Sequence, residues 1–152
     1  GEFPLLPFEA NINPLAPDYS VPATMCHELA HTRGFMREDE ANFIGYLACR
    51  KSDSPEFRYS GVMLALVHAE NRLYAADREL FFQVDALLSD GVRRDFAANN
   101  AYWARFEGPV AEVSTAVNNT YLRANNQSDG VKSYGRMVDL LLADYRQRHG
   151  ME

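Results

Sequence analysis

One pentapeptide in the sequence has the residue types and the spacing of a catalytic metal site: His27-Glu28-Leu29-Ala30-His31. Residues four apart lie on one face of a helix, so His27 and His31 can bind the same metal ion. Glu28 lies about 100° further around the helix, beside the position of a metal-bound water. Zn²⁺ held by two neutral imidazoles lowers the pKa of that water to roughly 7, and the glutamate accepts its proton as the hydroxide attacks a carbonyl. The pattern therefore predicts a zinc site with Glu28 as general base.

The neighbours of the motif favour a site in the protein interior over two exposed histidines on a charged helix. Apolar side chains surround the polar triplet at Met25, Cys26, Leu29 and Ala30. Polar groups that are buried in this way need partners. We therefore expect a buried helix whose two histidines bind a metal.

A catalytic zinc site also needs a third protein ligand and one open position. Gly34 is expected to end the first helix in the left-handed conformation, and Glu38 and Glu40 follow it closely. Because these two glutamates lie about 200° apart around a helix, only one of them can face the metal. Glu38 shares its face with Asn42, which is placed to hold the far ring nitrogen of a histidine ligand, whereas Glu40 shares its face with Ile44. We prefer Glu38 as the third ligand and keep Glu40 as the alternative.

The rest of the sequence predicts the elements that must position these residues. Residues 1–22 carry five of the seven prolines and are expected to be an extended segment, with a possible short edge strand within 8–13. From residue 23 onward the apolar residues recur at helical spacing. We expect helices at 23–33, 37–50, 55–89 (one long helix or a bent pair), 90–107, 110–125 and 133–149. The fold class is therefore mainly α, with one helical domain at 23–152 behind the extended segment.

Composition and charge exclude several classes of function. The 152 residues are 47% hydrophobic and 24% charged, as expected for one compact domain with its own core. A net charge of −6, spread along the chain, disfavours nucleic acid as a partner. The longest apolar run, 62–67, is far shorter than the ~20 residues of a membrane span, so this chain by itself is expected to be soluble. Cys26 and Cys49 are interpreted as buried free thiols, with a disulfide between them as the alternative.

The metal motif resembles that of a known class of enzymes. A His-Glu-x-x-His helix followed by a glutamate in a Glu-x-x-x-Asp/Asn helix is similar to the glutamate-zincin metallopeptidases, the group of thermolysin. In that pattern the first glutamate of the second helix is a zinc ligand. The resemblance assigns this role to Glu38, with Asn42 at the position of the aspartate, although Glu38 follows His31 at a much shorter distance along the chain than in thermolysin.

Nearly the whole chain resembles a bacterial zinc-dependent peptidase-like family, which is catalogued as domain of unknown function 3810. The segments that carry this resemblance are residues 26–31, 33–35, 37–44, 59–61 and 129–136. Members of that family have membrane-spanning helices ahead of this domain. The resemblance therefore implies that the full-length protein is membrane-associated, on an unknown side of the membrane. The opening Gly1-Glu2 is consistent with a cut inside a longer protein.

Peptidases of this class usually add a donor that stabilises the oxyanion from the far side of the metal. Tyr134 and Arg136 are our candidates, because the glycine-adjacent start of the last expected helix lets side chains reach a cleft. The alternative is an ordinary helix start with a solvated arginine. The aromatic residues Tyr102, Trp103 and Phe106 are interpreted as core packing.

The leading hypothesis is a hydrolase: a zinc metallopeptidase that acts on a peptide or protein substrate. One alternative is a catalytically inactive regulator or partner-binding domain, in which zinc staples two helices. Another is a helical interaction module that carries the motif by chance. The presence of Glu28 argues against an inactive zinc site, since a structural site has no use for a base.

Overall fold

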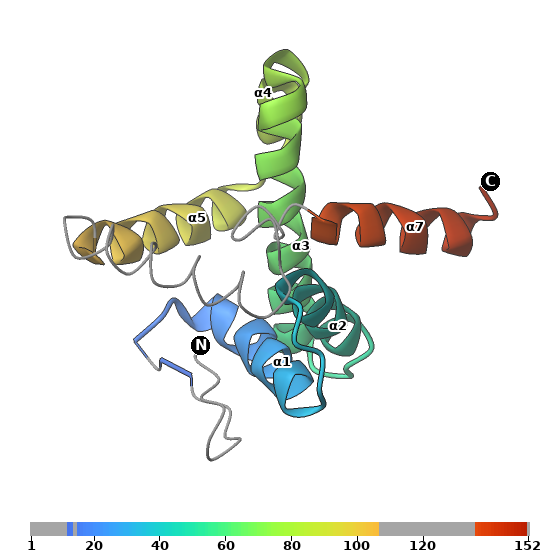
Figure 1. Ribbon diagram of the computed structural model, residues 1–152. Coiled ribbons are helices and arrows are strands. Elements are labelled where there is room, and N and C mark those ends of the chain that lie inside the picture. The colour runs from blue at the N-terminus through green and yellow to red at the C-terminus, as the bar shows by residue number, and fades with distance from the viewer. Residues whose placement is uncertain (1–11, 14, 107–135, 152) are drawn as a thin grey trace.

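The computed structural model describes residues 12–13, 15–106 and 136–151, and helices dominate this part of the chain (Figure 1). In chain order the elements are η1 (Asp18–Ser20), α1 (Val21–Thr32), α2 (Glu38–Arg50), α3 (Pro55–Ala76), α4 (Arg78–Asp85), α5 (Asp90–Trp103), η2 (Ala104–Phe106) and α7 (Met137–His149). No strand occurs among the described residues. The prediction of a mainly α protein is confirmed. The helix expected at 110–125, and most of the segment with the possible edge strand, lie outside the described residues.

Helix α1 begins earlier than the sequence predicted. We expected the extended segment to run to residue 22, but a 3-10 turn at Asp18–Ser20 leads directly into α1 at Val21. Pro22 lies in the first turn of the helix, where a backbone N–H would have no partner within the helix. A proline is therefore tolerated at this position, and it does not mark the end of the extended segment.

The turn after α1 is built on Gly34. This residue has φ +93°, the left-handed conformation that the sequence predicted, and glycine adopts it without steric cost. Gly34 N donates to His31 O and Phe35 N donates to Ala30 O, at 3.0 and 3.2 Å. These two hydrogen bonds form a Schellman motif, which ends α1 and turns the chain back toward it.

The segment expected at 55–89 as one long helix or a bent pair contains two separate helices, α3 and α4, and α4 ends at Asp85. The break falls at Asp77, whose backbone is extended with φ −152° and ψ 98°. The Asp77 side chain accepts a hydrogen bond from Leu80 N at 2.9 Å, so it caps the start of α4. Ser54 and Ser89 cap α3 and α5 in the same way. A short polar side chain therefore begins each of these three helices.

Helices α1, α2 and α3 pack against one another and form the core of the described structure (Figure 1). Small residues bring them close together. A Cβ built on Gly61 of α3 would lie 2.6 Å from Cys49 Cβ, and one on Gly45 of α2 would lie 3.2 Å from His27 N. Figure 1 places α5 and α7 on opposite sides of α3, and α7 also contacts α2. The His27–His31 motif therefore lies within the three-helix core of the described residues.

The two cysteines face each other across the α1–α2 interface. Both are free thiols, and their Sγ atoms lie 3.7 Å apart. Cys49 is fully buried, whereas Cys26 is half-buried. Burial, together with the neighbouring Cys26, raises the pKa of Cys49 to about 12. The structure therefore contains free thiols, as expected, rather than the alternative disulfide.

None of the helices in the described residues combines the length and the apolar character that a bilayer crossing requires.

Candidate metal centre

Three side chains from α1 and α2 converge on one point. His27 and His31 lie one turn apart on α1, and Glu38 is the first residue of α2. The two Nε2 atoms are 3.0 Å apart, and Glu38 oxygens lie 3.4 Å from His27 Nε2 and 3.6 Å from His31 Nε2. Zinc bonds of about 2.0–2.1 Å at tetrahedral angles separate two ligand atoms by about 3.3–3.4 Å. The three distances bracket this value, so the cluster fits a zinc ion.

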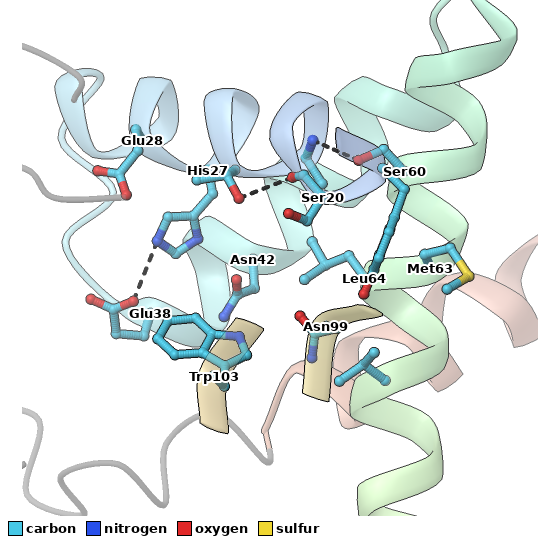
Figure 2. Close-up of a pocket in the computed structure, with 14 residues that line it drawn as sticks. Ser20, His27, Glu28, Glu38, Asn42, Ser60, Met63, Leu64, Asn99 and Trp103 are labelled. Atoms are coloured by element: carbon cyan, nitrogen blue, oxygen red, sulfur yellow. Dashed lines mark hydrogen bonds and ion pairs between the residues drawn. The ribbon is translucent and has the colours of Figure 1, made fainter. Parts of the chain in front are cut away.

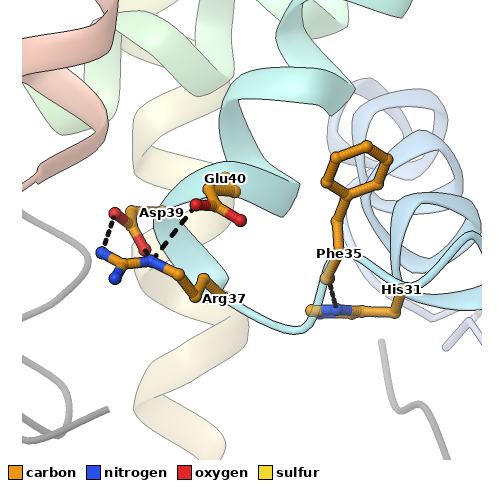
Figure 3. Close-up of polar contacts among 5 residues, drawn as sticks. All are labelled: His31, Phe35, Arg37, Asp39 and Glu40. Atoms are coloured by element: carbon orange, nitrogen blue, oxygen red, sulfur yellow. Dashed lines mark hydrogen bonds and ion pairs between the residues drawn. The ribbon is translucent and has the colours of Figure 1, made fainter. Parts of the chain in front are cut away.

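His31 is oriented by the backbone of the Gly34 turn. Its Nδ1 donates a hydrogen bond to the carbonyl oxygen of Phe35 at 2.7 Å, as Figure 3 shows. The proton is therefore on Nδ1, which leaves the Nε2 lone pair toward His27 and Glu38. A hydrogen bond to the far ring nitrogen is the usual way in which a protein fixes a histidine ligand.

Asn42 does not make the contact that we expected from the sequence. The far nitrogen of His31 is held by the Phe35 carbonyl instead. His27 Nδ1 is buried, and no hydrogen-bond partner for it occurs among the described residues. Asn42 is itself buried and lines the pocket beside the histidines (Figure 2). The prediction that Glu38 and Asn42 share one face of α2 was correct, because both line the same pocket. The prediction that Asn42 holds the far nitrogen of a histidine was wrong.

Glu38 is held in its charged form by the two histidines. Burial raises the pKa of this carboxyl, and the charge of Asp39 acts in the same direction. The hydrogen bond with His27, together with the positive charge that either histidine carries when it is protonated, outweighs both effects, so the pKa of Glu38 lies below its usual value. The side chain is therefore an ionised carboxylate at neutral pH, which is the form that binds metals.

Glu40 points away from the histidines. Its side chain is 45% exposed and lies 3.4 Å from Arg37 Nε (Figure 3). Arg37 also pairs with the buried carboxylate of Asp39 at 2.8 Å. Of the two glutamates weighed from the sequence, the structure therefore brings Glu38 to the histidines and Glu40 to an arginine.

Glu28 is buried next to the cluster, with 3% of its surface exposed. Figure 2 shows its carboxylate on the same side of α1 as the His27 ring and lining the same pocket.

The expectation that apolar residues surround the motif on α1 holds for only part of the helix. Met25 and Leu29 are 38% and 52% exposed, because they lie on the opposite face from His27 and His31.

A pocket of about 420 Å³ opens beside the cluster. Among the described residues, five elements contribute to its lining: Tyr19 and Ser20 of η1, Ala23, Thr24, His27 and Glu28 of α1, Glu38 and Asn42 of α2, Ser60, Met63, Leu64 and Val67 of α3, and Asn99 and Trp103 of α5. Trp103 is 59% exposed, which corrects its interpretation as a core residue, whereas Tyr102 is buried as expected. The spacing of Asn99 and Trp103, one helical turn apart, was the available signal that both line one surface.

The two residues proposed as oxyanion donors are not seen at this pocket. Tyr134 lies outside the described residues. Arg136 immediately precedes α7, is exposed, and does not line the pocket. Their assignment therefore stays a prediction from the sequence.

The fold and the cluster together define an all-α protein with a candidate site of two histidines and one glutamate. Residues 2–142 match the family described as "Protein of unknown function (DUF3810)", and the chain belongs to this family. No curated protein and no solved structure matches the chain at a significant level.

Proposed function

We propose that this chain is a zinc-dependent metallopeptidase domain. The observation that carries the proposal is the convergence of His27, His31 and Glu38, whose ligand atoms all lie within 4.8 Å of one another. The pairwise distances suit tetrahedral coordination of zinc, and both the tautomer of His31 and the charge of Glu38 suit metal binding.

Zn²⁺ bound here supplies Lewis acidity, which polarises a carbonyl group and makes water more acidic. The chain supplies the proton transfers. Glu28 is buried beside the ligands and lines the pocket, where it accepts a proton from the attacking water and returns it to the leaving amine. The pocket gives a peptide a route to these groups.

The number of ligands favours catalysis over a structural zinc. Structural zinc sites are closed by four protein ligands, whereas catalytic sites use three and leave one position open. Three metal-binding side chains converge among the described residues. A buried carboxylate that is not a ligand would also have no role in a site that only staples two helices.

The substitution Glu28→Gln tests the proposed reaction. The variant should bind zinc as the native chain does, because residue 28 is not a ligand, and should hydrolyse a quenched fluorescent peptide library ~10²–10⁴-fold more slowly. Zinc content and hydrolysis are measured on the same sample. Glu40→Gln is the matched control, since Glu40 is exposed and pairs with Arg37, and it should keep both zinc and activity.

Two results would count against the proposal. Loss of zinc in Glu28→Gln would mean that Glu28 is a ligand and not the base. A zinc-loaded native chain that hydrolyses no peptide of the library would favour the inactive, zinc-stapled domain.

A further inference from the structure

We propose that the pocket beside the metal cluster is a subsite for an uncharged, apolar side chain inside a peptide substrate. This inference rests on the metallopeptidase function proposed above. It adds the class of peptide that the site accepts, namely internal apolar positions rather than chain ends or charged residues.

One face of α3 forms the floor of this pocket. Ser60, Met63, Leu64 and Val67 follow the i, i+3, i+4, i+7 pattern, so they lie along one side of the helix. The Ser60 hydroxyl already accepts a hydrogen bond from Ala23 N at 2.9 Å, which joins α3 to the start of α1. The remaining three side chains are apolar, and Met63 is only 1% exposed. The exposed part of this floor therefore comes mainly from the half-buried Leu64 and Val67, which favour an aliphatic or aromatic group.

The charge of the pocket argues in the same direction. Its charged groups among the described lining residues are the carboxylates Glu28 and Glu38, and no lysine or arginine of the described part lines it. Apart from the proposed zinc ion, no cation of the described lining residues would compensate the desolvation of a terminal carboxylate or an acidic side chain. An ammonium group placed on the α3 floor would contact apolar side chains, since the two carboxylates belong to α1 and α2.

In this proposal, two carboxamides of the pocket lining bind the peptide backbone. Asn42 of α2 and Asn99 of α5 both line the pocket, and Figure 2 shows them with Trp103 around its wall. A carboxamide offers both a donor and an acceptor, which is the pair that a peptide group requires. The pocket volume of about 420 Å³ falls within the ~300–1,000 Å³ of small-ligand sites.

Binding of simple hydroxamates to the zinc-loaded chain separates the subsite from the metal. Acetohydroxamate reports the metal centre alone, 4-methylpentanehydroxamate adds an aliphatic tail, and succinate monohydroxamate adds a carboxylate. Calorimetry should give at least about tenfold tighter binding of the aliphatic compound than of acetohydroxamate, because its tail leaves water. The acidic compound should gain nothing.

Val67→Thr keeps the shape of the side chain and adds a hydroxyl to the floor. It should reduce the advantage of the aliphatic tail about threefold or more while leaving acetohydroxamate binding unchanged. Val62→Thr is the matched control: Val62 lies on the same helix, is 52% exposed and does not line the pocket. This control should bind all three compounds as the native chain does. A thermal melt of each variant checks that the fold is intact.

The outcomes distinguish the two proposals. If acetohydroxamate fails to bind the zinc-loaded chain, the proposed metallopeptidase function is overturned, and this inference with it. If acetohydroxamate binds but the aliphatic tail adds nothing, or the acidic compound binds more tightly, only the subsite is wrong. Equal losses in Val67→Thr and Val62→Thr would also overturn the subsite.

Discussion

At the scale of single residues, the candidate site depends on which carboxylate follows the two histidines. Glu38 and Glu40 are two positions apart, yet one lies 3.4 Å from His27 Nε2 and the other lies 3.4 Å from Arg37 Nε. A helix turns about 200° over two residues, so the first residue of α2 fixes which glutamate faces α1.

This difference predicts opposite effects of two similar substitutions. Glu38→Ala should weaken zinc binding at least about 100-fold, because it removes a charged ligand. Glu40→Ala should change zinc affinity less than about threefold, since an exposed ion pair contributes little. Titration with a competing chelator measures both affinities. If Glu40→Ala loses the metal and Glu38→Ala keeps it, the assignment of the third ligand is wrong.

At this scale the sequence could predict which three side chains converge, but not the group that orients His31. The spacing of His27, His31 and Glu38 follows from helix geometry, which side-chain patterns report. The partner of His31 is the backbone carbonyl of Phe35, and a backbone atom leaves no signature in residue types. Because Asn42 shares a helix face with Glu38, the sequence suggested Asn42 as the partner of a histidine. In the structure Asn42 lines the same pocket as Glu38.

At the scale of elements, the Gly34 turn links the end of α1 to the site. The left-handed residue closes the Schellman motif and thereby brings the Phe35 carbonyl to His31 Nδ1. The short distance in sequence between His31 and Glu38 is possible because this turn reverses the chain within a few residues.

Gly34→Ala should therefore affect both stability and metal binding. A side chain in the left-handed region costs roughly 1–2 kcal/mol, and relief of this strain would move Phe35 away from His31. Denaturant unfolding of the zinc-free chain and zinc titration measure the two effects. Gly150→Ala is the matched control, because Gly150 also has positive φ, at the end of α7, far along the chain from the site. If both variants bind zinc equally well, the turn does not position the ligand.

The packing of α2 on α3 gives a second prediction for the elements. A Cβ on Gly61 would meet Cys49 Cβ at 2.6 Å, so Gly61→Ala should lower the free energy of unfolding by about 1–3 kcal/mol. Gly91→Ala is the control: only Ser89 Oγ, at 3.8 Å, lies near its new methyl group, and helix α5 should tolerate or favour alanine. Equal melting temperatures for the two variants would show that α2 and α3 are not packed this closely.

Element positions were largely predictable, and the exceptions have physical reasons. Helical periodicity located the described helices. Ser54 and Ser89 mark the starts of α3 and α5, and Gly34 follows the end of α1. Pro22 was misleading because a proline is compatible with the first turn of a helix. The sequence left undetermined whether and where the segment 55–89 is broken. An aspartate such as Asp77 marks a helix start only when its side chain caps the next turn.

At the scale of the whole molecule, the candidate metal joins the two helices that begin the core. α1 supplies two of the candidate ligands, α2 supplies the third, and both helices pack on α3. The pocket also depends on this assembly, because its lining comes from α5 as well as from these helices. Such an arrangement depends on how the helices pack, which periodicity alone does not determine. For this reason the position of Trp103 at the pocket did not follow from periodicity, although its spacing from Asn99 indicated that the two share one helix face.

Bound zinc should therefore stabilise the fold as well as complete the site. A ligand that binds only the folded chain raises the unfolding free energy by about 4 kcal/mol at a thousandfold excess over its dissociation constant, and the melting temperature rises accordingly. This stabilisation and the binding itself should be lost together when His27 or His31 is replaced by alanine.

The measurement that tests the account most directly is the zinc content of the reconstituted chain, combined with X-ray absorption at the zinc edge. We predict about one zinc per chain, bound only by nitrogen and oxygen ligands that include two imidazoles, and no bound zinc in His27→Ala or His31→Ala. A native chain that retains no zinc after reconstitution, or a zinc bound through the sulfur of Cys26 or Cys49, would contradict the proposed site.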